Sequence, residues 1–238
     1  MTDLRDFRMW SVARLLGIAM LAFAALTTQA SGISLATLVG GAPVPSGGLV
    51  FSDFEIQING DLSTDLSSYD IAFSGSGLRL TGPLSGADGE TGSVFLAYTV
   101  TATGSNDVSG ASMLASNVAN GPGAQAAVDA VLTDNGSAMT LAVLSTFDTG
   151  GIPGDAVTAA SASFAPSTDL RVTSTILIDS AIVGGGFGGS ARITAIEQQF
   201  VVTPEAETAA LLTLGLLGLA TAGRNRRPKR GGPLGQLA

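Results

Sequence analysis

The sequence predicts an all-β fold, an antiparallel β-sandwich with jelly-roll or Greek-key connections, over residues 31–202. Apolar and polar residues alternate with a period of two in one segment after another, which is the pattern of half-buried strands. Clusters of Gly, Pro and Asn separate these segments and mark turns. Charged residues make up 13% of the 238 residues and glycine contributes 32, a composition that argues against a coiled coil or a helical enzyme.

The predicted strands are short and follow one another at intervals typical of a two-sheet antiparallel domain. The alternation is clearest in 94–101, where Val94, Leu96, Tyr98 and Val100 point one way and Phe95 points the other. Met139, Leu141 and Val143 form the apolar set of another strand, and 124–132 also fits a helical period. In order, the predicted strands are 54–59, 69–73, 78–81, 94–101, 108–114, 124–132, 139–143, 157–164, 170–179 and 191–202.

Turn chemistry supports this division of the chain. Asn135-Gly136 lies between two predicted strands, and Asn-Gly tolerates the positive φ angles of a type I′ hairpin turn. Gly60 ends an earlier strand in the same way. The predicted loops are 40–48, 82–92, 120–123, 150–154 and 184–189.

Residues 1–30 have the three parts of a secretory signal peptide. Arg5, Arg8 and Arg14 precede an apolar stretch over 15–26, which is too short to span a bilayer. Small residues follow, and Ala30 occupies the −1 position of the predicted cleavage site. Signal peptidase is therefore an expected partner, and the domain after Ala30 is expected to fold outside the cytoplasm.

The C-terminal part contains a second apolar segment beside a basic cluster. Residues 208–223 (TAALLTLGLLGLATAG) are predicted to form a transmembrane helix, whose sixteen residues rise about 24 Å. The positive-inside rule keeps the basic cluster in the cytoplasm and leaves the domain on the exported side. Residues 231–238 are predicted to be a disordered tail. The basic cluster, a stop-transfer signal, consists of Arg224, Arg226, Arg227, Lys229 and Arg230.

The order of parts over residues 203–230 resembles the PEP-CTERM sorting signal of exported Gram-negative bacterial proteins. Pro204 and Glu205 match the first two positions of its Pro-Glu-Pro motif, whereas Ala206 replaces the second proline. The resemblance implies that an exosortase-type membrane protease recognises Pro204, Glu205 and Ala206. An ordinary C-terminal membrane anchor is the alternative.

The same resemblance implies a location and a role. The chain would pass through an intermediate anchored in the inner membrane and would reach the cell surface or the extracellular matrix. There it would be a structural or adhesive component of the extracellular polysaccharide or biofilm. The alternative role is that of a calcium- or glycan-binding module held by a simple anchor.

The amino-acid composition excludes several kinds of catalytic and binding site from the domain. The chain has no histidine and no cysteine, so it lacks the commonest general base, thiol nucleophiles and disulfides. Residues 31–203 contain fifteen acidic residues, three arginines and no lysine, and their net charge of −12 argues against nucleic acid as a partner.

Two carboxylates would suffice for a glycosidase. The domain has few aromatic residues to bind sugar rings, however, so we expect a protein that is not an enzyme. The candidate carboxylates are Asp53, Glu55, Asp88, Glu90, Asp148 and Asp155.

No cofactor is predicted, with calcium as the alternative. Oxygen ligands for calcium are available in the pairs Asp88/Glu90, Asn106/Asp107 and Asp148/Asp155, but no segment matches an EF-hand. The run 184–189 satisfies the dinucleotide pattern G-x-G-x-x-G. Because a strand rather than a helix is expected after it, we predict a loop there.

Overall fold

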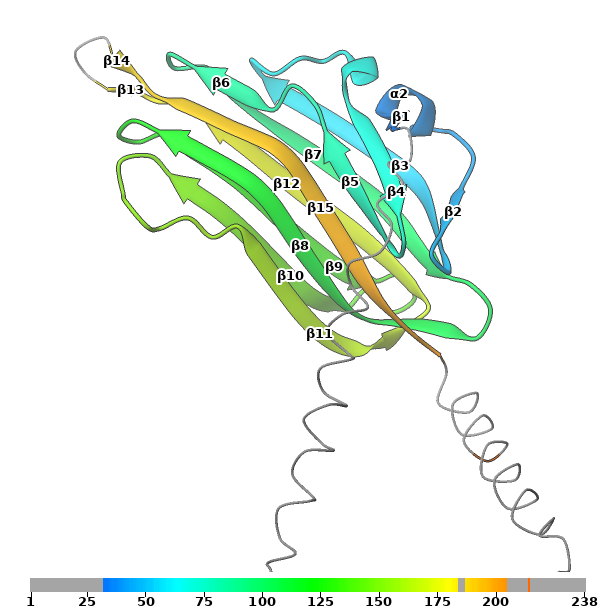
Figure 1. Cartoon of the computed structure of the whole chain (residues 1–238). Coiled ribbons are helices and arrows are strands. Elements are labelled where there is room, and N and C mark those ends of the chain that lie inside the picture. Colours follow the sequence, from blue (N-terminus) through cyan, green and yellow to red (C-terminus); the bar gives the residue numbers. More distant parts are fainter. Residues whose placement is uncertain (1–31, 184–186, 205–213, 215–238) are drawn as a thin grey trace, which may run out of the picture. The chain divides into compact units, whose positions relative to one another are not determined.

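The computed structural model describes residues 32–183, 187–204 and 214, and it contains two antiparallel sheets that form a β-sandwich (Figure 1). The prediction of an antiparallel β-sandwich is therefore confirmed. The predicted signal peptide with Ala30, the basic cluster and the tail lie outside the described residues, as does segment 208–223 apart from Leu214. In the part of the chain that the structure describes, no helix has the length and apolar character needed to cross a membrane.

The first sheet has the strand order β1-β4-β5-β15-β8-β11, and β6 also pairs with β15. The last strand of the domain, β15, is thus an inner strand, with β5 and β6 on one side and β8 on the other. The strands are β1 (Ile33–Ser34), β4 (Asp70–Ser74), β5 (Gly77–Thr81), β6 (Ser85–Ala87), β8 (Asn106–Asn120), β11 (Ala159–Ser167) and β15 (Ser190–Pro204).

The second sheet has the strand order β10-β9-β12-β7-β3-β2. A short hairpin, a single helical turn and a 3₁₀ turn complete the described elements: β13 (Ile182–Val183) with β14 (Phe187–Gly188), α2 (Leu35–Leu38) and η2 (Leu66–Ser68). The strands of the second sheet are β2 (Val44–Ser46), β3 (Leu49–Gly60), β7 (Thr91–Ala102), β9 (Gln125–Asp134), β10 (Thr140–Thr149) and β12 (Asp169–Asp179).

The core forms where the alternation in the sequence is strongest. In β7, Val94, Leu96, Tyr98 and Val100 are all buried, as predicted, and β12 buries its alternate residues from Leu170 to Ile178 in the same way. Side chains of the two inner faces interdigitate in such a sandwich, and their removal from water is its main source of stability.

The structure corrects the predicted orientation of β10. Met139, just before the strand, and Val143 are exposed, whereas Ala142 and Leu144 are buried. Both alternating sets of this strand contain apolar residues, so its periodicity does not decide which set faces the core. Val143 instead lies opposite Val131 of β9 on the outer face of the sheet.

The β9–β10 hairpin is present, but its turn is not the predicted type I′ turn. Gly136 does not have a positive φ angle, whereas Ala138 has a φ of 57°. Asp134 holds the loop by accepting hydrogen bonds from the backbone N–H and the hydroxyl of Ser137, which lower the pKa of Asp134. The segment 124–132, for which a helix was the alternative, is mostly strand β9.

Several predicted boundaries also shift. The strands β2, β6 and β14 lie within segments predicted as loops, and β8 continues to Asn120 instead of ending at Leu114. Strand β15 continues to Pro204, two residues beyond the predicted end. These extra and longer strands form because their backbones pair with a neighbouring strand. Such pairing cannot be read from the local amino-acid composition.

A buried polar bridge links the two sheets. The hydroxyl of Tyr98 in β7 donates a hydrogen bond to Oε1 of Gln198 in β15, and Gln198 Nε2 donates to Oγ of Ser174 in β12 at 3.0 Å. Nε2 also lies 3.7 Å from Sδ of Met113. Burial raises the pKa of Tyr98, so its hydroxyl remains a donor at neutral pH.

Replacing Tyr98 with phenylalanine should therefore destabilise the domain. The variant Tyr98→Phe leaves Gln198 Oε1 buried without its donor, which costs about 1–3 kcal/mol of unfolding free energy. Denaturant unfolding of the full chain measures this loss, and Ser116→Ala, which removes an exposed hydroxyl from β8, is the matched control. Equal unfolding free energies for the two variants would contradict the role assigned to the bridge.

Candidate functional site

The C-terminal end of β15 carries the start of the predicted sorting motif. Pro204 is the last residue of this strand, is exposed, and lies opposite Asn106 of β8 in the register. The side-chain amide of Asn106 donates to the carbonyl of Thr103 at 2.8 Å, which holds the start of β8 against the preceding loop. Glu205 and Ala206, the other two motif residues, lie outside the described residues. The chain is therefore paired within the sheet up to the first position of the motif.

The outer face of the second sheet carries an aromatic ring in a row of polar side chains, here called the Phe95 row. Phe95 of β7 is 38% exposed and lies between Gln57 of β3 and Thr175 of β12. The row continues to Asp129 of β9 and Ser145 of β10, whose hydroxyl donates to the Asp129 carboxylate. Since adjacent strands lie about 4.8 Å apart, these five positions extend over roughly 19 Å.

A second row on this face lies beside the first, two residues away on each strand. Asn59, Ser93 and Leu177 lie side by side on β3, β7 and β12, and Ala127 and the partly buried Phe147 continue the row on β9 and β10. The face thus combines two phenylalanine side chains with amide, hydroxyl and carboxylate groups. Such a surface offers apolar contact for the C–H face of a sugar ring and hydrogen-bonding partners for its hydroxyls.

Sequence reasoning did not single out the Phe95 row. It did place Phe95 on the polar side of its strand, and an aromatic residue among outward-facing positions is the signal that points to this face. The other members come from four strands far apart in the sequence, so only the sheet register reveals that they are neighbours.

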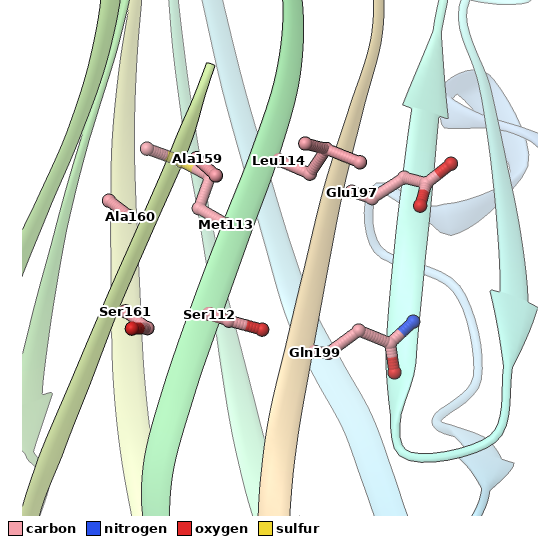
Figure 2. Close-up of a pocket in the computed structure, with 8 residues that line it drawn as sticks. All are labelled: Ser112, Met113, Leu114, Ala159, Ala160, Ser161, Glu197 and Gln199. Carbon is pink, nitrogen blue, oxygen red and sulfur yellow. The ribbon is translucent and has the colours of Figure 1, made fainter. Parts of the chain in front are cut away.

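The outer face of the first sheet contains a shallow depression of about 350 Å³ across β8, β11 and β15 (Figure 2). Glu197 is held by an ion pair with Arg79 of β5, with Nε 3.5 Å from Oε1. No aromatic side chain lines the depression, and Glu197 supplies its one charge. This arrangement does not assemble a nucleophile, an acid and a base. The eight lining residues are Ser112, Met113, Leu114, Ala159, Ala160, Ser161, Glu197 and Gln199.

The carboxylates considered for hydrolysis have other partners. Glu55 forms an ion pair with Arg171, with Oε1 2.8 Å from Nη2. The same guanidinium donates to the backbone carbonyl of Asp53, which has a φ of 52° at a bulge in β3, and the Asp53 carboxylate accepts from the Ser52 hydroxyl. The first two candidates thus belong to an open sheet face rather than a cleft.

The calcium candidates fall into two groups. In the first group, Glu90 accepts a hydrogen bond from the backbone N–H of Ala87, and the amide of Asn106 donates to the carbonyl of Thr103. The pairs Asp88/Glu90 and Asn106/Asp107 therefore do not direct their ligands to a common point. Asp148 and Asp155, in contrast, flank the turn between Phe147 and Val157, which pair with each other. Across the described ranges, no group of three or more acidic residues gathers into a metal site.

The glycine run 184–189 is followed by a strand, as predicted. Residues 184–186 lie outside the described residues, Phe187–Gly188 forms β14, and β15 begins at Ser190. The helix whose N-terminus would bind a pyrophosphate does not follow the run.

Comparison with known proteins yields no family. No family model and no curated protein matches the chain. Solved structures that match in part include the TmCBM61 structure in complex with β-1,4-galactotriose, at 11% identity and a TM-score of 0.29 over 63% of this chain and 88% of that chain.

Two further structures match more weakly. The enzymatically active domain of tailspike protein 4 from bacteriophage CBA120 has 13% identity and a TM-score of 0.26, over 65% of this chain and 19% of its own. The arabinose-bound MgGH51 α-L-arabinofuranosidase has 18% identity and a TM-score of 0.26, over 74% of this chain and 25% of its own. TM-scores this low do not establish a shared fold, so these matches do not bear on function.

Proposed function

We propose that this chain is a non-enzymatic exported protein that an exosortase-type protease sorts at Pro204, Glu205 and Ala206. Its sandwich domain would then be a structural or adhesive component of the extracellular polysaccharide matrix. The observation that carries the proposal is the place of the motif: it begins at the exposed last residue of an inner strand, Pro204 of β15.

This position makes cleavage and folding independent of each other. Every backbone pairing of β15 with β5, β6 and β8 lies at or before Pro204. A protease that cuts after the motif therefore removes none of the described strands of the sandwich. The released or transferred product keeps the complete domain, which is what a sorting signal requires of the protein that carries it.

The outer face of the second sheet supports an adhesive role. The Phe95 row offers one partly exposed ring with an amide on one side and hydroxyl and carboxylate groups on the other. Residues 31–203 contain no lysine and have a net charge of −12, so they repel anionic polymers. The polysaccharide that this face fits best is therefore a neutral one.

The second candidate is a glycan-binding module that keeps an uncleaved C-terminal anchor, and the Phe95 row favours it equally. The two candidates differ in the fate of residues 207–238, which sorting removes and a simple anchor retains. The form of the C-terminus in exported material consequently separates them.

Cleavage at the motif can be tested in a Gram-negative host that expresses an exosortase. We expect mass spectrometry of the exported chain to find a C-terminus close to Ala206, and the double variant Pro204→Ala, Glu205→Ala to remain uncleaved in the membrane. Glu207→Ala, just outside the motif, is the matched control and should be cleaved normally. Exported chain that is intact through Ala238 would support the simple anchor instead.

Polysaccharide binding can be tested with the variant Phe95→Ala. Loss of the ring should weaken binding of the full chain to neutral matrix polysaccharide at least tenfold, because contact with one aromatic side chain is worth about 1.5 kcal/mol or more. Leu114→Ala removes a side chain of similar exposure from the opposite sheet and should leave the affinity unchanged. Affinity electrophoresis measures both variants, and equal retardation of the two would exclude this face as the binding surface.

A further inference from the structure

A polar depression of about 420 Å³ lies on the outer face of the first sheet, where β15 runs between β6 and β8. It is separate from the depression shown in Figure 2, and the two have no lining residue in common. We call it the Arg192 depression. Its polar side chains are Ser85, Glu90, Asn120, Ser190 and Arg192.

The sheet register places the guanidinium of this depression. Arg192 alternates along β15 with the buried Ala191 and Ile193, so its side chain faces outward. In the register, Arg192 lies between Ser85 of β6 and Val118 of β8. One neighbour thus offers a hydroxyl, and the other is an apolar side chain that is 38% exposed.

A second polar row lies beside the first. Ser190, two residues before Arg192, shares its face and lies opposite Asn120 of β8. The side-chain amide of Asn120 donates to Oγ of Ser190 at 3.5 Å. The amide oxygen and the second N–H of Asn120 remain available for a ligand.

The turn between β6 and β7 holds Glu90 in a fixed position at the same depression. Glu90 Oε2 accepts from the backbone N–H of Ala87 at 3.1 Å, which leaves Oε1 for a ligand. The carbonyl of Glu90 accepts from both the backbone N–H and the hydroxyl of Ser180, at 3.1 and 2.8 Å. The N–H of Asp88, a residue with a φ of 52°, donates to the carbonyl of Gly189 just before β15. Because these bonds fix the turn, a ligand would not have to order it.

The two charged groups of the depression have no counter-ion among the described residues. Residues 31–203 contain three arginines, of which Arg79 and Arg171 form ion pairs with glutamates. Arg192 and Glu90 form none in the described ranges, although both line the same depression. A ligand between them has to accept hydrogen bonds from a guanidinium and donate hydrogen bonds to a carboxylate.

Sugar hydroxyls do both, because each is a donor and an acceptor. An anionic ligand would meet the Glu90 carboxylate and a domain with a net charge of −12, and a cationic ligand would meet Arg192. The volume of about 420 Å³ is near the lower end of the range for small-molecule pockets, roughly 300–1,000 Å³. The depression therefore fits a short neutral saccharide.

We propose that the Arg192 depression binds one or two units of a neutral saccharide. Arg192 donates to its hydroxyls, Glu90 accepts from them, and the exposed part of Val118 contacts the C–H groups of the ring. This site lies on the opposite sheet from the Phe95 row, and the proposal depends neither on that row nor on the sorting of the chain.

Saturation-transfer NMR of the full chain tests the proposal, in a detergent without a sugar headgroup. The neutral probes are cellobiose, lactose and mannobiose, and digalacturonate is the acidic probe. We expect saturable binding of at least one neutral disaccharide, with a dissociation constant of roughly 1 mM, because no aromatic ring lines the site. Digalacturonate should bind at least fivefold more weakly.

Matched variants assign this binding to the depression. Arg192→Gln and Glu90→Gln remove a charge with little change of shape, and each should weaken binding of the neutral disaccharide at least fivefold. Arg79→Gln is the control, because it removes an exposed arginine of the same sheet that is already paired with Glu197. This control should leave the affinity unchanged.

The same titration in Phe95→Ala separates the two glycan surfaces. We expect this variant to keep the disaccharide binding that Arg192→Gln weakens, whatever the fate of polysaccharide binding at the Phe95 row. Three results would overturn the inference: no saturable binding of any neutral probe, tighter binding of digalacturonate, or undiminished binding by both Arg192→Gln and Glu90→Gln.

Discussion

The sandwich depends on its last strand. Strand β15 pairs with β8 along most of its length and with β5 and β6 on its other side, so the first sheet has no continuous set of hydrogen bonds without it. It also contributes Phe200, whose ring packs 6.1 Å from that of Phe51 in the opposite sheet. A chain of this topology cannot complete its core until residues close to the C-terminal segment have joined the sheet.

The buried bridge from Gln198 strengthens the same dependence. Gln198 joins Tyr98 of β7 and Ser174 of β12, so one side chain of the last strand satisfies polar groups on two strands of the other sheet. An amide with both ends bonded fits only one relative position of the sheets, whereas apolar contacts tolerate small sliding. The bridge thus sets the register between the sheets.

The sequence predicts the parts of this structure that local pattern controls. The alternation of β7 and β12 identifies the buried faces correctly, because one set of residues in each strand is strongly apolar. The predicted orientation of β10 is wrong because Val143 and Leu144 are both apolar, and only the pairing of β10 with β9, which sets Leu144 opposite the buried Ala130, shows which one is buried. The turn after Asp134 is likewise set by a side chain that caps the loop rather than by the Asn-Gly pair.

The candidate sites depend even more on tertiary structure. The sorting motif is continuous in the sequence, and the structure adds that its first residue ends an inner strand. The Phe95 row combines residues from distant strands, so only the register of the sheet shows that they are neighbours.

Among the described residues the last strand of the sandwich ends at Pro204, and we infer that the folded domain does not depend on the segment that follows. Amide hydrogen exchange tests it most directly, by comparison of the full chain with the same chain after cleavage at the motif. We expect equal protection of the β15 amides in both forms, at the level of the neighbouring strand β8. Loss of protection over residues 196–204 after cleavage would contradict it.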